Sequence, residues 1–250
     1  MKGLTSKVGE VINPKGAPIG VKMLEDEAGL KEAGVGKLER NLALCQLFKY
    51  VSLYKKTRGV VFDNIDACVV GSYILGLGVP PEDLKERWIK GWRYSDKLFE
   101  ALVSQIHALP QGKYKAAIFA PLEDLERRDI KPDAVLLTVN STQAYLVAVG
   151  YFDATGKKIS SDFNGHAACE VVAAVIQGKS PWLTIPCGGA RGVAGAQDDE
   201  LWMGMTVEEL ETTVDRLASV GLAYPPGIYQ SAISPLAADH PLTYLVTRKP

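Results

Sequence analysis

The sequence lacks an excess of charge of one sign, and it lacks long apolar runs. Its 28 Lys and Arg residues nearly balance 29 Asp and Glu residues, so the formal net charge is −1. Binding of nucleic acid through a broad basic surface needs an excess of positive charge, so we expect no nucleic-acid partner. The longest apolar stretch, ACVVGSYILGLGV, is shorter than the roughly 20 residues that cross a bilayer, so we expect no membrane span.

A secretory signal and closely spaced cysteine pairs are also missing. The first residues, MKGLTSKVGEVINPKG, contain no apolar segment typical of a signal peptide, so we expect a cytoplasmic protein. Its cysteines are then expected to stay reduced rather than to form disulfides. None of them belongs to a CxxC pair of the kind typical of zinc sites and of many iron–sulfur clusters. Any site that they share must therefore be assembled by the fold. The four cysteines are Cys45, Cys68, Cys169 and Cys187.

The composition is otherwise that of a globular protein. Of the 250 residues, 47% are apolar and 23% are charged. Strand-like and helix-like segments occur along most of the chain, which predicts a single α/β domain over residues 1–250. Residues 223–250 are rich in proline and poor in periodicity, so we expect a C-terminal tail there.

The order of the predicted elements recurs, which indicates a weak internal duplication. Residues 40–59 form an amphipathic helical pattern, and a strand-like segment and a second helix beginning at Cys68 follow. Residues 140–158 form another helical pattern, which leads to a helix beginning at Cys169. The duplication thus predicts equivalent positions for the two cysteines.

A second pair of segments supports the same duplication. Residues 115–128 and 200–213 both have the pattern of a strand that leads into a helix, and in the second Thr206 begins a capping box. The predicted halves are about 17–110 and 115–222, and we expect a site between them.

Two cysteines and a histidine have settings that favour chemistry. Cys68 and Cys169 each begin a predicted helix, where free N–H groups and the helix dipole favour a thiolate that acts as a nucleophile or a metal ligand. Burial as small apolar side chains is the alternative. His166 lies three residues before Cys169, so the pair is expected to act as nucleophile and base, or as two metal ligands.

The stretch TIPCGGARGVAGAQDDE predicts a binding loop after a strand. Cys187, Gly188 and Gly189 leave backbone N–H groups accessible beside the permanent charge of Arg191, which suits a carboxylate, a phosphate or a tetrapyrrole propionate. The stretch does not match the glycine patterns of nucleotide-binding loops. A flexible glycine loop without a ligand is the alternative.

Two acids close the same stretch. Asp198 and Asp199 could pair with Arg191, bind a hard cation or cap the next strand, and the sequence does not distinguish these roles. Together with the glycines and the arginine they are the predicted substrate-binding residues for a small anionic ligand.

Several segments carry a family resemblance: APIGVK, LCQ, ACVVGSYILGLG, FAPLEDL, PDAVLL, HAACE and PCGGARGVAGAQDDEL. Through them the chain resembles the archaeal and bacterial proteins grouped as domain of unknown function 169. The resemblance implies a shared cytoplasmic fold and site, with family positions at all four cysteines and at Arg191, but no known reaction. The family often has an acid just before that arginine, where this chain has Ala190, so a local acid–arginine pair is not carried over.

These features predict an enzyme with a cysteine-lined site between the two halves, acting on a small anionic substrate by lyase, hydrolase or redox chemistry. Cys68, Cys169 and Cys187 would supply thiolates, with His166 as base or ligand. Arg191 and the glycine loop would hold the anion. The same residues are compatible with a transition metal, with an iron–sulfur cluster or with no cofactor at all. The sequence is also compatible with a homo-oligomer. The alternatives are a noncatalytic carrier or sensor of a metal, cluster or tetrapyrrole, and a protein whose cysteines are structural.

Overall fold

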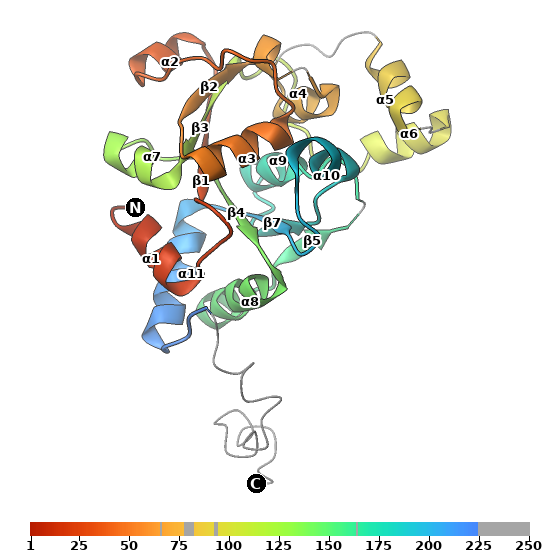
Figure 1. Ribbon diagram of the computed structural model, residues 1–250. Coiled ribbons are helices and arrows are strands. Elements are labelled where there is room, and N and C mark those ends of the chain that lie inside the picture. The colour runs from red at the N-terminus through yellow and green to blue at the C-terminus, as the bar shows by residue number, and fades with distance from the viewer. Residues whose placement is uncertain (66, 78–82, 93–94, 164, 225–250) are drawn as a thin grey trace.

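A mixed β-sheet runs through the centre of the molecule, as the computed structural model shows (Figure 1). The structure describes residues 1–65, 67–77, 83–92, 95–163 and 165–224, so the predicted tail lies outside the described residues from residue 225 onward. In this part of the chain the sheet has seven strands in the order β2-β3-β1-β4-β7-β6-β5. Neighbouring strands are antiparallel, except for the parallel pair β5 and β6. The strands are β1 (Ile19–Leu24), β2 (Arg58–Val61), β3 (Ala116–Pro121), β4 (Ala134–Val139), β5 (Ser160–Asp162), β6 (Trp182–Thr184) and β7 (Leu201–Met205).

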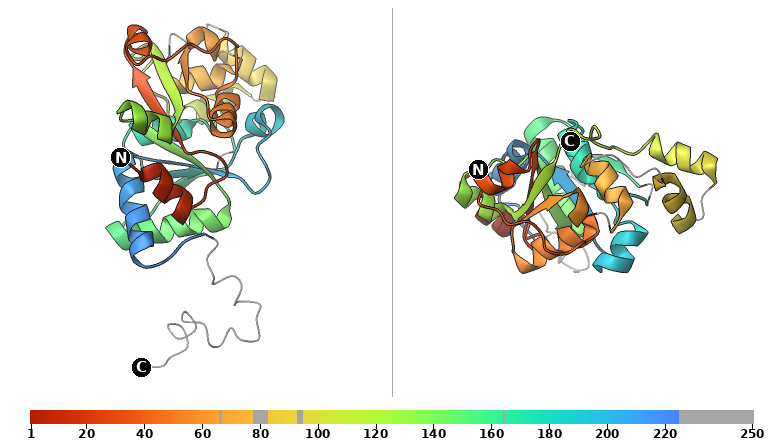
Figure 2. Two further views of the ribbon diagram at one scale, coloured as in Figure 1. Left: turned by 60° about the vertical axis from the view of Figure 1, so that its left-hand side comes forward. Right: turned by 90° about the horizontal axis from the view of Figure 1, so that it is seen from above.

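Helices cover both faces of this sheet (Figures 1 and 2). On one face lie α3 (Leu44–Tyr54), α4 (Val69–Leu75), α9 (Glu170–Ile176) and α10 (Gly188–Ala194). On the other lie α1 (Leu4–Val11), α2 (Ala28–Glu32), α7 (Leu122–Arg128), α8 (Ser141–Thr155) and α11 (Val207–Ser219). The helices α5 (Leu84–Trp92) and α6 (Asp96–Val103) project from the body, and the short 3-10 helix η1 (Phe62–Asn64) follows β2. This arrangement confirms the predicted single α/β domain.

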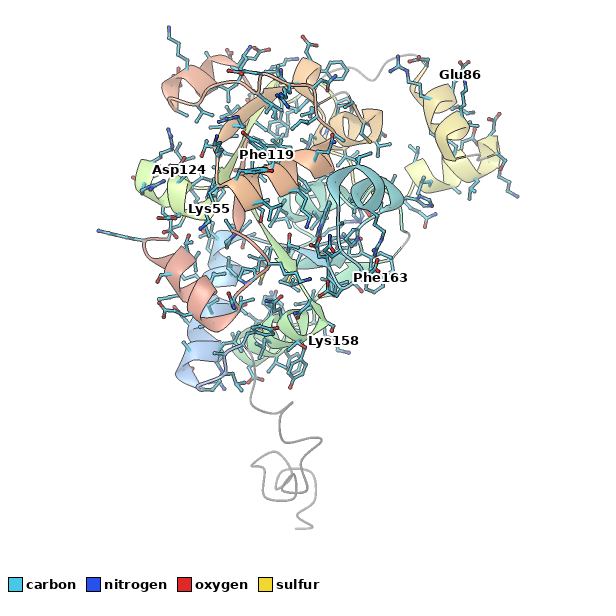
Figure 3. The ribbon with its side chains drawn as sticks, viewed as in Figure 1. Lys55, Glu86, Phe119, Asp124, Lys158 and Phe163 are labelled. Carbon is cyan, nitrogen blue, oxygen red and sulfur yellow. The ribbon has the colours of Figure 1, made fainter. Side chains whose placement is uncertain are left out.

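The central strands are apolar because both of their faces are covered. Every residue of β3 is buried. Phe119 points to the face of α3 (Figure 3), where its ring centroid lies 5.7 Å from that of Phe48. Ile118 belongs to the apolar cluster on the opposite face. Because side chains alternate along a strand, one apolar run fills two cores.

Capping residues set the ends of the helices. The predicted capping box at Thr206 is confirmed, since its hydroxyl accepts the N–H of Glu209 at the start of α11. The helix α8 is capped by Asn140, one residue before the expected Ser141 or Thr142, and Asn140 forms a reciprocal pair with Gln143. The side-chain oxygen of an asparagine caps a helix as effectively as a serine or threonine hydroxyl does. The sequence therefore predicted the start of α8 only to within one residue.

The internal duplication is not confirmed in the form that the sequence predicted. The helices α3 and α8 lie on opposite faces of the sheet, and β5 pairs in parallel whereas β2 pairs antiparallel. In the strand order, β3 and β2 lie on one side of the β1–β4 pair, and β7, β6 and β5 lie on the other. Cys68 follows β2, Cys169 follows β5 and Cys187 follows β6.

The described helices are short. None of them combines the length and the apolar composition that crossing a membrane requires.

Candidate functional site

All four cysteines line one cavity of about 350 Å³, on the sheet face that carries α3, α4, α9 and α10. Cys45 is the second residue of α3, and Cys68, Cys169 and Cys187 directly precede α4, α9 and α10. Cys45 and Cys169 are buried, the other two are partly buried, and all four are free thiols. Residues far apart in the sequence therefore meet at one place, as the shared-site hypothesis requires.

The local sequence explains why helices begin at these cysteines. The Sγ atom of Cys187 accepts the N–H of Ala190 at 3.5 Å and so caps α10. At the start of α4 the carbonyl of Cys68, not its sulfur, accepts the N–H of Gly71 at 2.9 Å. A Cβ atom on Gly71 would lie 2.8 Å from the Cβ of Leu44, so the glycine lets α4 approach α3.

The rest of the cavity lining is mostly apolar. Among the described lining residues there is no carboxylate, lysine or arginine, and the polar side chains other than the thiols are those of Gln46 and His166. The Nε2 group of Gln46 donates to the carbonyl of Val193 at 3.2 Å, which joins α3 to α10. The apolar lining residues are Ala43, Leu44, Ala67, Val70, Gly71, Ala167, Gly189 and Val193.

His166 reaches the cavity through a tight turn. Gly165 and Ala167, on either side of it, have φ angles of 74° and 52°, in the left-handed region. An alanine is uncommon there, and such strain occurs often at functional sites. Burial lowers the pKa of His166 below its usual value, so its imidazole is neutral at neutral pH. The predicted proximity of His166 and Cys169 is thus found at the cavity.

The thiols are harder to ionise than the sequence predicted. Burial raises the pKa of Cys45 to about 12, with smaller contributions from the neighbouring thiols of Cys187 and Cys68. Burial likewise raises the pKa of Cys68, and it raises that of Cys169 well above its usual range. The expectation of a lowered pKa at Cys68 and Cys169 is therefore wrong. The N–H groups at a helix start favour the thiolate, but removing the charge from water costs more.

The predicted glycine loop is also wrong in its local structure, because Gly188 and Gly189 form the first turn of α10. Gly189 lines the cavity. Arg191 does not line the cavity. Its Nε donates to the carbonyl of Pro186 at 3.2 Å, and its Nη1 lies 3.3 Å from Oδ1 of Asp198. Both contacts are therefore to residues close to α10 in the sequence.

The second acid of that stretch points elsewhere. Asp199 forms an ion pair with Lys15, and the hydrogen bond from Lys15 lowers the pKa of Asp199. Neither Asp198 nor Asp199 lines the cavity. Of the five predicted substrate-binding residues, only Gly189 reaches it.

Two charged residues near the site were missed by the sequence analysis. Lys49 of α3 and Glu200, directly before β7, form an ion pair with Nζ–Oε distances of 2.5 and 2.7 Å. The side chain of Glu200 is 3% exposed and that of Lys49 is 14% exposed. Lys49 lies one helical turn after Cys45, and this spacing is a signal that the sequence contains. Glu200 is the last of three consecutive acids, after Asp198 and Asp199, and nothing in the sequence shows which of the three is buried.

The site does not contain a ready-made cage for a single ion. Over the described ranges, no three His, Cys, Asp or Glu side chains are close enough to hold one metal ion.

Fold and cavity together define the class, an α/β protein with a cysteine-lined pocket. Residues 7–216 match the DUF169 family, described as "Uncharacterised ArCR", and the chain belongs to this family. The chain is also similar to an uncharacterised protein of Methanocaldococcus jannaschii, with 25% identity over 206 residues that cover 80% of this chain and 85% of the relative. No solved structure matches the chain significantly.

Proposed function

We propose that the cysteine cavity binds a soft metal centre and that the protein acts as a carrier or sensor of that centre. The observation that carries this proposal is the convergence of four free cysteines from four helices on one mostly apolar cavity. Thiolates select soft metals such as copper(I), zinc and iron in clusters, whereas magnesium and calcium prefer oxygen ligands.

The electrostatics of the cavity support a cationic ligand. The described lining offers no lysine or arginine to balance a buried thiolate, and burial raises the pKa of three of the thiols. A metal cation supplies the missing positive charge, and each sulfur that binds it loses its proton. A cytoplasmic location, part of the same proposal, would keep the thiols reduced until the metal binds.

Anaerobic purification, followed by elemental analysis for iron, zinc, copper and sulfide and by absorption spectroscopy, tests this proposal. We expect metal in a fixed ratio to protein, with Cys169→Ser and Cys187→Ser losing most of it. The control is Arg191→Lys, which leaves the cavity lining intact and should retain the metal. Protein that takes up none of these metals, even when each is added anaerobically to the full chain, would contradict the proposal.

A second candidate is the enzyme that the sequence predicted, and His166 favours it. A neutral imidazole on the same cavity could accept the proton of Cys169 or Cys68, so that the thiolate attacks a small anionic substrate. In this case small carboxylates or phosphates should protect the thiols of the metal-free protein from alkylation. Alkylation at an unchanged rate in the presence of these anions would contradict this candidate.

A further inference from the structure

We propose that the centre is a polynuclear iron–sulfur cluster held by all four cysteines, and not a single metal ion. The inference rests on the proposed function and names the ligand class of the same site. It follows from the arrangement of the thiols around a cavity of about 350 Å³.

The distribution of the four thiols around the lining of one cavity is compatible with a cluster. A single zinc ion sits about 2.3 Å from each thiolate, so its ligands must crowd around one point. No three potential ligands of the described chain are grouped in this way, although four cysteines share one cavity. A four-iron cluster needs the opposite arrangement, in which each iron at a separate corner takes one thiolate.

The four thiols nevertheless share one space. Cys45, Cys68, Cys169 and Cys187 all line the same cavity, so one ligand bound there can meet all four sulfurs. A cationic metal core would offset the repulsion among the four thiolates that bind it.

A hydrogen bond to sulfur supports the same ligand. The peptide N–H group of Ala190 donates to the sulfur of Cys187 at 3.5 Å. Such bonds stabilise thiolates without adding a charged side chain, and in iron–sulfur proteins they tune the reduction potential. The mostly apolar remainder of the lining limits contact with water.

Loading of the site is written as an exchange of ligands. A preformed cluster that carries four small thiolates gives each iron to one cysteine, and each departing thiolate leaves as a thiol with the proton of that cysteine. Four iron–sulfur bonds break and four form. No electron is transferred, so the step needs neither oxidant nor reductant.

The test uses the full chain, freed of metal by a chelator and kept under anaerobic conditions. It is incubated with a synthetic four-iron cluster that carries mercaptoethanol ligands and, in a separate sample, with zinc alone. After gel filtration, the iron, sulfide and zinc content per chain and the visible absorption are measured. We expect about four irons and four sulfides per chain.

Variants identify the ligands. Serine in place of Cys45, Cys68, Cys169 or Cys187 should reduce the retained iron severalfold, whereas His166→Gln should retain the full amount. Loss of the cluster in His166→Gln with retention in Cys45→Ser would overturn ligation by four cysteines. Unfolding of each apo variant is measured in parallel, and Cys187→Ser, at a partly exposed position, serves if the buried variants do not fold.

The two proposals fail in different ways. One zinc per chain without retained cluster would overturn the cluster and leave a thiolate metal site. Failure of the cluster, zinc and other soft metals to bind would overturn both proposals.

Discussion

At the scale of single residues, the chemistry of the cysteines depends on the balance between desolvation and hydrogen bonding. The N–H groups of Val70 and Gly71 favour the thiolate of Cys68, but burial opposes it more strongly, and its pKa rises. The same holds for Cys45, which has a pKa of about 12. In the metal-free protein these thiols are protonated at neutral pH, so they are expected to react slowly with alkylating reagents.

The raised pKa of Cys45 predicts a dependence of stability on pH. Below about pH 9 the thiol is protonated in both the folded and the unfolded chain, and its contribution to stability is fully present. Between about 9 and about 12 only the unfolded chain loses the proton, so stability falls as the pH rises. From pH 8 to pH 10 the free energy of unfolding of the metal-free protein should fall by about 1 kcal/mol more than that of Cys45→Ala.

Urea unfolding of both proteins at the two pH values measures this difference. Parallel changes in the two proteins would show that the Cys45 thiol ionises equally easily in the folded and unfolded states.

At the scale of elements, the site depends on how α3 packs against its neighbours. The Gln46 side chain connects α3 to α10, the absence of a side chain on Gly71 brings α4 close, and the pair of Lys49 and Glu200 fastens α3 to the segment before β7. These contacts set the positions of the helices that carry Cys45, Cys68 and Cys187. They contribute to the site without supplying a ligand.

Removal of one partner of the buried ion pair should be costly. Lys49→Met leaves the carboxylate of Glu200 buried without its counter-ion, and we expect a loss of about 3 kcal/mol in the free energy of unfolding. Replacing both residues, as Lys49→Met with Glu200→Gln, should restore part of this loss, because no uncompensated charge is left. Chemical denaturation provides the measurement.

The matched control is Lys7→Met. The ion pair of Lys7 with Asp215 is about half exposed on both sides, so its loss should cost less than about 1 kcal/mol. Similar losses in the free energy of unfolding for Lys49→Met and Lys7→Met would mean that burial does not make the pair of Lys49 and Glu200 more important for stability.

Gly71→Ala tests the spacing of α3 and α4. The added Cβ would lie 2.8 Å from that of Leu44, so the helices must separate, and overpacking of this kind costs about 1–3 kcal/mol. Metal affinity should fall about tenfold or more, although no ligand is changed. Gly192→Ala in α10 is the control, because its Cβ meets no atom within 4 Å and alanine favours a helix. Titration of both variants with metal compares them, and equal affinities would show that this spacing does not affect the site.

At the scale of the whole molecule, the cysteines come from both sides of the central β1–β4 pair. Cys45 and Cys68 precede β3 in the chain, whereas Cys169 and Cys187 lie between β4 and β7. A ligand bound to all four cysteines would therefore connect the segments before β3 with the segments before β7, on one face of the sheet.

Removal of the bound centre should accordingly destabilise the whole protein. Since a ligand that binds only the folded state adds stability in proportion to the logarithm of its excess over Kd, a 100-fold excess adds about 2.7 kcal/mol. We expect the Tm of the loaded protein to exceed that of the metal-free protein by several degrees, as measured by calorimetry. In Cys169→Ser the two values should coincide. A loaded wild-type protein with an unchanged Tm would contradict the binding of one ligand by all four cysteines.

The sequence by itself determined the α/β class, many of the helix starts and the absence of close cysteine pairs, because local patterns and short-range hydrogen bonds control these features. The capping box at Thr206 and the helices that begin after Cys68 and Cys169 are examples. The family resemblance was equally available from the sequence, and it is confirmed over residues 7–216.

Only the tertiary structure brought Cys45 into the cavity, left Arg191 outside it and raised the thiol pKa values. It also did not confirm the predicted duplication, since α3 and α8 lie on opposite faces of the sheet. The physical reason is the same in each case. The desolvation and the proximity of these side chains depend on which helices cover which face of the sheet. That packing brings together residues that are far apart in the chain, and their spacing in the sequence does not predict their contact.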